Sequence, residues 1–234
     1  MSSRLQYPTA CALSDAMFQA HYAAGHRNFS DSVLIDVDLG AVEALRGVLL
    51  QNVDLRQVRN LRAVDLSYAD LTGVNLSGMN LQGTNLQWAV LCGANLQGAQ
   101  LSRANLAQAN LSRADLRAVG LEFGRLDGAN LVGACLDGAD LHHAYLEGSN
   151  LPGVSIVAAN LCEADLARSN LSRADLRRSN LTWVSLRGAN LDEADLRHVN
   201  LSWADLDGTN LSLAHCESVQ MRGVRLPLGS RIVG

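Results

Sequence analysis

The chain has 234 residues, of which 48% are hydrophobic and only 4% aromatic, and its formal net charge at pH 7 is −4. That length allows one or two ordinary domains. A charge so close to balance gives no indication of nucleic-acid binding and little support for a dense acidic mimic of nucleic acid. Twenty glycines against three prolines also argue against a disordered linker protein.

The sequence predicts a cytoplasmic protein without membrane association. No run approaches the roughly 18 apolar residues that a membrane span requires. Asp15 interrupts the early apolar stretch, so we expect no secretory signal. The five cysteines form no CxxC pair, which favours a reducing compartment with inert thiols over a disulfide framework. They are Cys11, Cys92, Cys135, Cys162 and Cys216.

Residues 1–28 are expected to form a separate N-terminal segment with a short helix at about 14–24. Ser14 is a candidate N-cap and Gly25 a candidate residue just past the C-cap. Phe18 and Tyr22 are spaced to share one apolar face. Such a face can cover the open end of a repeat stack, whose last coil would otherwise meet water.

A five-residue pattern, Ala-Asn/Asp-Leu-x-x, fills residues 29–226 and is clearest from Ala104 to Arg117. Two six-residue steps, which end at Leu45 and Leu61, interrupt it early and are interpreted as bulges or corner adjustments. From Leu61 to Leu226 leucine recurs at every fifth position, with three exceptions. These exceptions are Ile156, Cys216 and Met221. Residues 227–234 leave the pattern as a C-terminal tail.

A period of five fits neither a straight helix nor a flat strand. On an α-helix five residues turn the chain by about 500°, which scatters the leucines. On a strand, an odd step places successive leucines on opposite faces. A chain that turns a corner every five residues buries Leu and the small residue two positions before it. Asn or Asp tolerates left-handed and turn conformations and can bond its own neighbouring backbone, so we expect it at or beside the corner.

The repeat resembles the pentapeptide-repeat family over about residues 29–226. The resemblance implies an all-β solenoid, a right-handed quadrilateral β-helix with four pentapeptides per coil and about ten coils. The stretch from His21 to Phe29 also resembles the entry segment of cyanobacterial members, including a regulator of heterocyst differentiation. The apolar C-terminal end, with Val219, Met221, Val224 and Leu226, must be covered either by the tail at 227–234 or by a second chain, and the resemblance implies a homodimer there.

No catalytic, metal or cofactor site is predicted. The sequence contains no GxSxG, no HExxH and no glycine-rich phosphate loop. His142 and His143 are the one adjacent histidine pair, and their side chains are expected to diverge. Cys162 falls one coil after His142, but two ligands are too few for zinc. We therefore expect a protein that is not an enzyme.

The outward positions supply a candidate interaction surface, because large aromatic and arginine side chains are favoured at binding hot spots. Trp183 and Trp203 lie one coil apart, as do Tyr68 and Trp88. Stacking that only stabilises the rod is the alternative interpretation. The arginines gather late in the chain and suggest either a solvated face or an anion-binding surface. The candidate residues are Tyr68, Trp88, Phe123, Arg173, Arg177, Arg178, Trp183, Arg197 and Trp203.

These features predict a rigid, non-enzymatic scaffold for protein–protein interaction, which could regulate a partner by occluding it. The partner is an unidentified protein, and no direct binding to nucleic acid is expected. The alternative is a DNA-mimic modulator of DNA gyrase of the quinolone-protection type, which some family members represent. The near balance of 19 basic and 23 acidic residues is unfavourable for such a mimic.

Overall fold

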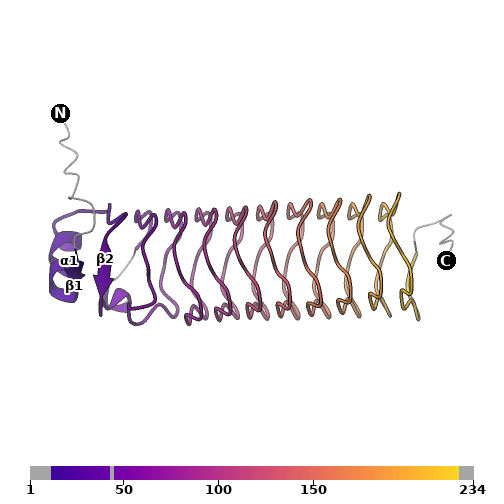
Figure 1. Ribbon diagram of the computed structural model, residues 1–234, viewed down its shortest axis with the longest axis horizontal. Coiled ribbons are helices and arrows are strands. Elements are labelled where there is room, and N and C mark those ends of the chain that lie inside the picture. The colour runs from indigo at the N-terminus through magenta and orange to yellow at the C-terminus, as the bar shows by residue number, and fades with distance from the viewer. Residues whose placement is uncertain (1–11, 43–44, 227–234) are drawn as a thin grey trace, which may run out of the picture.

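The computed structural model describes residues 12–42 and 45–226, which form one elongated rod of stacked coils (Figure 1). Parallel bridges join residues twenty positions apart, such as Asn85 to Asn105 and Asn105 to Arg125. Each coil of the regular region therefore contains four pentapeptides, and the rod is a quadrilateral β-helix. Among the described residues, no helix is long and apolar enough to cross a bilayer.

Each corner is a tight turn over leucine and the three residues after it. In the turn at Leu101, the Ala104 N–H donates to the Leu101 carbonyl at 2.9 Å, and Arg103 has a φ of +59°. A positive φ at the third residue is the requirement of a type II turn. Glycine fills many of these positions because it adopts a positive φ without strain, as in Gly98 (φ +65°).

The Asn and Asp residues of the motif lie beside the corner and not in the turn itself. These residues lie on the flat sides, where Asn105 bridges to Asn85 and to Arg125. The Asn105 Oδ1 accepts the Ala107 N–H at 3.1 Å, and its Nδ2 donates to Asn85 Oδ1 at 3.2 Å. The side chain thus satisfies a backbone donor at the next corner and joins neighbouring coils, a role that Asn performs with both of its polar atoms.

From Leu61 to Leu206 the predicted inward positions are buried, apart from the partly buried Met79. Leu141 and Ala104 have no exposed surface, and the same holds for the leucines one coil apart along the same side. This column comprises Leu81, Leu101, Leu121, Leu141 and Leu161. Since every coil adds the same layer, the core is one continuous stack along the rod.

Helix α1 (Asp15–Ala23) lies at the N-terminal end of the rod (Figure 1) and is one residue shorter at each end than the expected 14–24. Strand β1 (Ala12–Ser14) precedes it and pairs in parallel with β2 (Val33–Ile35). Phe18 is fully buried, and its ring centroid lies 4.5 Å from that of Phe29. Ser14 occupies the N-cap position, as predicted, but its side chain makes no cap hydrogen bond.

Asp15 fastens α1 to the first coil. Its Oδ1 accepts the Asp38 N–H at 2.9 Å, and this hydrogen bond lowers the pKa of the carboxyl group below its ordinary value. Gln19 Nε2 donates to the Asp38 carbonyl at 3.1 Å. The helix is therefore held by polar contacts at the chain's entry into the stack as well as by Phe18.

The two six-residue steps lengthen the early coils, where bridges such as Asp38 to Arg59 join residues 21 positions apart. The first step contains the 3-10 helix η1 (Leu39–Ala41) and runs through residues 43–44, outside the described residues. In the second step Asn60 is the extra residue, with a φ of +56° and its Nδ2 donating to Asp38 Oδ2 at 2.9 Å. The tail at 227–234 also lies outside the described residues.

Candidate interaction surface

One corner of the rod carries three of the six exposed Phe, Tyr and Trp side chains of the described residues. We call it the aromatic corner, and it consists of Phe123, His143, Glu163, Trp183 and Trp203, each one coil after the last. The rings of Trp183 and Trp203 stack with centroids 5.2 Å apart and planes 11° apart. Trp183 is 56% exposed and Trp203 is 42% exposed, so the pair forms a flat apolar patch on the surface.

The backbone conformation at the aromatic corner is unfavourable for residues that carry a side chain. Phe123, Trp183 and Trp203 have φ values of +57°, +62° and +65°, at the turn position where many other repeats place glycine. A residue with a Cβ loses about 1–2 kcal/mol in this conformation. Stacking of an aromatic pair returns about 0.5–1.5 kcal/mol. The stacking therefore offsets only part of the strain of two tryptophans.

Trp203 also covers the next coil. A Cβ added at Gly223 would lie 2.2 Å from Cε3 of Trp203, so the indole rests directly on that glycine. The Arg222 guanidinium lies 5.6 Å from the indole centroid, within range of a cation–π contact. The two tryptophans thus sit close to the C-terminal end of the described chain.

Tyr68 and Trp88 occupy a neighbouring corner nearer the N-terminal end. Their rings stack at 6.5 Å with planes 12° apart, and the Arg46 guanidinium lies 4.6 Å from the Tyr68 centroid. Farther along, this corner is largely glycine, at Gly128, Gly148, Gly188 and Gly208. The structure therefore separates the two aromatic pairs instead of joining them in one patch.

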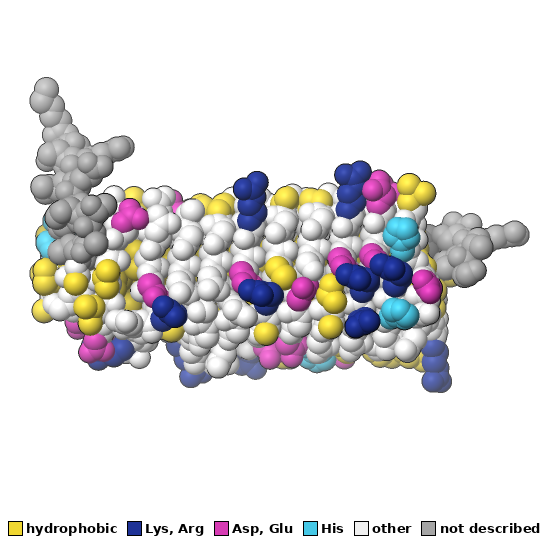
Figure 2. All heavy atoms as spheres, in the orientation of Figure 1, with side chains coloured by type: hydrophobic (Ala, Val, Ile, Leu, Met, Phe, Trp, Pro, Cys, Tyr) yellow, Lys and Arg dark blue, Asp and Glu magenta, His cyan; other side chains and the backbone are white. Residues whose placement is uncertain are grey.

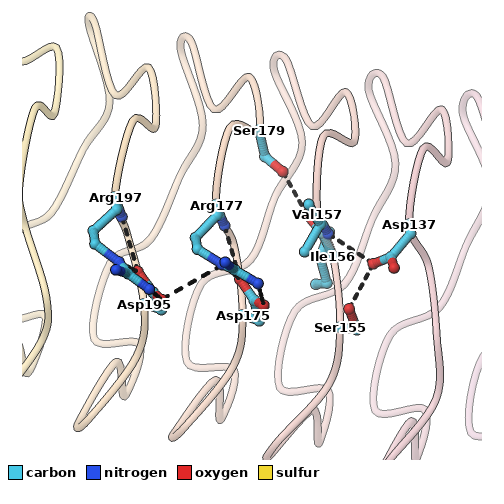
Figure 3. A network of polar contacts seen from close by, with 9 residues as sticks. All are labelled: Asp137, Ser155, Ile156, Val157, Asp175, Arg177, Ser179, Asp195 and Arg197. Carbon is cyan, nitrogen blue, oxygen red and sulfur yellow. Dashed lines mark hydrogen bonds and ion pairs between the residues drawn. The ribbon is translucent and has the colours of Figure 1, made fainter.

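Most of the late arginines are neutralised by carboxylates (Figure 3). Arg177 contacts Asp175 at 2.6 Å and Asp195 at 3.6 Å, and Arg197 contacts Asp195 at 2.6 Å. Hydrogen bonds from these guanidinium groups hold the pKa of Asp175 and Asp195 below the ordinary value. A surface whose cations are already paired offers little to an external anion.

Two further candidate arginines are Arg173, on the preceding corner, and Arg178, which follows Arg177 in the same turn. Arg173 pairs with Glu193 at 2.9 Å, whereas Arg178 makes no ion pair within the described part of the chain. Figure 2 shows acidic side chains next to basic ones along the visible face. Neither sign of charge dominates this face, which fits the solvated face better than the alternative of an anion-binding surface.

Asp137 supplies a hydrogen-bond acceptor where one repeat departs from the pattern (Figure 3). Ser155 stands where most repeats have Asn or Asp, and Asp137 of the preceding coil accepts both the Val157 N–H at 2.9 Å and the Ser155 hydroxyl at 2.6 Å. Ser179 of the following coil donates its hydroxyl to the Ile156 carbonyl. These polar groups serve the fold and are not free for chemistry.

The prediction that His142 and His143 diverge is wrong. Both occupy the central positions of one turn, and their ring centroids lie 4.0 Å apart. The Nδ1 of His143 lies 3.4 Å from Oε2 of Glu163, one coil away. The turn projects two consecutive side chains from one corner, which the pattern alone does not show. The spacing of twenty residues between two corner positions is the sequence signal that would have paired His143 with Glu163.

The C-terminal end of the stack is incompletely covered by the described residues. Val219, Met221 and Val224 pack against the core but are only partly buried, and Leu226 is 37% exposed. The corresponding inward residues of the coil before, such as Val199 and Leu206, have no exposed surface. This end is the least buried part of the hydrophobic stack.

The repeat architecture and the sequence define the same class of protein. A family model described as pentapeptide repeats matches the chain in eight copies, over overlapping segments from residue 60 to residue 226. The chain belongs to the pentapeptide-repeat family, as its sequence predicts. Membership implies a right-handed quadrilateral β-helix. Proteins of this family are generally non-enzymatic structural or interaction proteins.

Solved structures of the family include similar chains. HetL, a pentapeptide-repeat protein involved in heterocyst differentiation regulation in the cyanobacterium Nostoc sp. strain PCC 7120, is 30% identical, with 94% of this chain and 100% of HetL covered and a TM-score of 0.43. QnrB1, a plasmid-mediated fluoroquinolone resistance protein, is 18% identical over 94% of both chains, with a TM-score of 0.46. A search of curated proteins gave no match.

Proposed function

We propose that this chain is a non-enzymatic scaffold that binds a protein partner through Trp183 and Trp203 of the aromatic corner. The stacked, exposed pair is the observation that carries the proposal. Tryptophan is enriched at interface hot spots, where a large rigid ring is buried with little loss of side-chain entropy. Two such rings on a hydrogen-bonded rod form a preorganised platform.

The proposal includes regulation by occlusion. A rod whose four corners are fixed by turns and whose sides are fixed by ladders presents a constant surface, which can block access to a partner. The polar groups that catalysis requires are largely used by the fold, such as Asp137 in its contacts with Ser155 and Val157. We place this role in the cytoplasm, where a reducing environment keeps cysteines free, as the four described cysteines are.

Affinity capture from the source organism tests the proposal. The wild-type chain is compared with Trp183→Gly/Trp203→Gly, in which glycine retains the left-handed turn without strain. Trp88→Gly is the matched control, because it makes the same change on another corner. We expect a protein that is captured by wild type and control and depleted at least about tenfold with the double variant. Equal capture by all three chains would contradict the proposal.

Modulation of DNA gyrase is the less supported role. The paired charges of Asp175 and Asp195 leave no dense acidic face there to imitate phosphates. A supercoiling assay decides the point, since a modulator changes the supercoiling rate at micromolar protein. We expect no change.

We also propose that a second copy covers the C-terminal end through Val219, Met221, Val224 and Leu226. The support is their incomplete burial, since exposed apolar edges of a β-stack invite pairing. Light scattering at micromolar concentration should give the mass of a dimer, and Val224→Arg should give that of a monomer. A monomeric wild type would refute this proposal.

A further inference from the structure

His142, His143 and Glu163 form a cluster outside the tryptophan pair. One ligand atom from each of the three side chains lies within 4.8 Å of the other two. The two imidazoles come from one turn, and the carboxylate comes from the same corner one coil later. Two histidines and one glutamate are the ligand set of many sites for zinc and related divalent ions.

The backbone beneath the cluster is fixed by hydrogen bonds. The His143 N–H donates to the Cys162 carbonyl at 3.0 Å, and the Phe123 N–H donates to the His142 carbonyl at 3.1 Å. The His142 N–H donates to Asp140 Oδ1 at 3.1 Å. The ligands therefore project from a rigid frame, and only their side-chain torsions need to adjust.

Phe123 orients the imidazoles. Its ring stacks on His143 with centroids 4.8 Å apart, and it meets His142 edge-on at 6.4 Å. Both histidines are half-buried, while Glu163 is exposed. Packing that restricts the rings reduces the entropy lost when a metal binds.

We propose that His142, His143 and Glu163 bind one zinc-class divalent cation at the aromatic corner. Ligand atoms around tetrahedral zinc, with bonds of about 2.0–2.2 Å, stand about 3.4 Å apart. Small rotations of the imidazoles and of the exposed carboxylate bring the present separations into that range. Three protein ligands leave one position for water or for a side chain of another molecule. Magnesium and calcium prefer oxygen ligands and do not suit this set.

Isothermal titration with ZnCl2 tests the site on the full-length chain under reducing conditions. We expect one zinc ion whose dissociation constant rises about tenfold or more in His143→Ala and in Glu163→Gln. His198→Ala is the matched control, because His198 also occupies a left-handed corner position, at φ +61°, and should leave this binding event unchanged. MgCl2 should give no binding that depends on His143.

Thermal melting by circular dichroism separates loss of the site from loss of the fold. All variants should melt like wild type without metal, and ZnCl2 should raise the melting temperature of wild type and His198→Ala but not of Glu163→Gln. Zinc binding that is equal in wild type, His143→Ala and Glu163→Gln would overturn the proposal. Neither readout involves Trp183, Trp203 or a protein partner. Failure of the zinc proposal would therefore leave the proposed scaffold function untouched.

Discussion

At the scale of single residues, the second x of each repeat is the position where the backbone restricts the side chain most, because this residue must adopt a left-handed φ. Many repeats place glycine there, yet the aromatic corner holds Phe123, Trp183 and Trp203 in that conformation. Their large side chains are thus retained against the preference of the backbone. This is the physical reason to look for function at corners that lack glycine.

Gly138 and Ala158 test the energetic effect of the corner conformation. They stand on the same corner one coil apart, with φ values of +67° and +55°, and a Cβ added at Gly138 meets no atom within 4 Å. We expect Gly138→Ala to lower the free energy of unfolding by about 0.5–1 kcal/mol and Ala158→Gly to raise it by a similar amount. Urea unfolding measures both, and changes of the same sign would contradict the explanation.

Leucine at the inward position is predicted to dominate stability. Leu141 has no exposed surface, so Leu141→Ala should cost about 2–5 kcal/mol through lost burial and a cavity. Leu213 is 75% exposed at a corner, and Leu213→Ala should change stability by less than about 0.5 kcal/mol. Equal losses in denaturant unfolding would show that the inward and outward assignment does not control stability.

At the scale of the element, the recurring Asp-Leu-Arg segment forms its own ion pair. The arginine side chain turns back to the carboxylate two residues earlier, as in Asp115–Arg117 at 2.5 Å and Asp195–Arg197 at 2.6 Å. Its hydrogen bonds hold the pKa of these aspartates below the ordinary value. The pairs are exposed to solvent, so each contributes little alone.

The sign of the pH dependence follows from these lowered pKa values. A carboxylate with a folded pKa below its unfolded value of about 3.9 stabilises the fold above that pH and loses the effect as the pH falls through the folded pKa. The carboxylate contribution to the melting temperature should therefore be constant from about pH 5 upward and decline below about pH 4. Arg117→Gln/Arg177→Gln/Arg197→Gln should weaken the acid decline, and an unchanged profile would contradict this.

At the scale of the whole molecule, each coil contacts mainly its neighbours, so stability is local along the rod. Phe18→Ala removes a fully buried ring that α1 places against Phe29. We expect faster amide hydrogen exchange in residues 29–50 and unchanged exchange in residues 160–206, measured by mass spectrometry. Faster exchange along the entire rod would show instead that the stack unfolds as one cooperative unit.

The sequence by itself determined which residues form the hydrophobic core of this protein. A five-residue period allows one consistent buried face only if the chain turns at every repeat, so the burial of Leu141 and Ala104 follows from the pattern. The N-terminal helix was also readable, from the apolar residues near Phe18, to within one residue of Asp15–Ala23.

Only the tertiary structure decided which residue turns the corner and what meets across coils. The period states how often the chain turns but not at which outward position, so the left-handed φ of Arg103 was missed. In the same way, the approach of His143 to Glu163 depends on the direction in which a turn projects its two central side chains. Those directions are set by backbone torsions and stacking, which a repeat pattern does not encode.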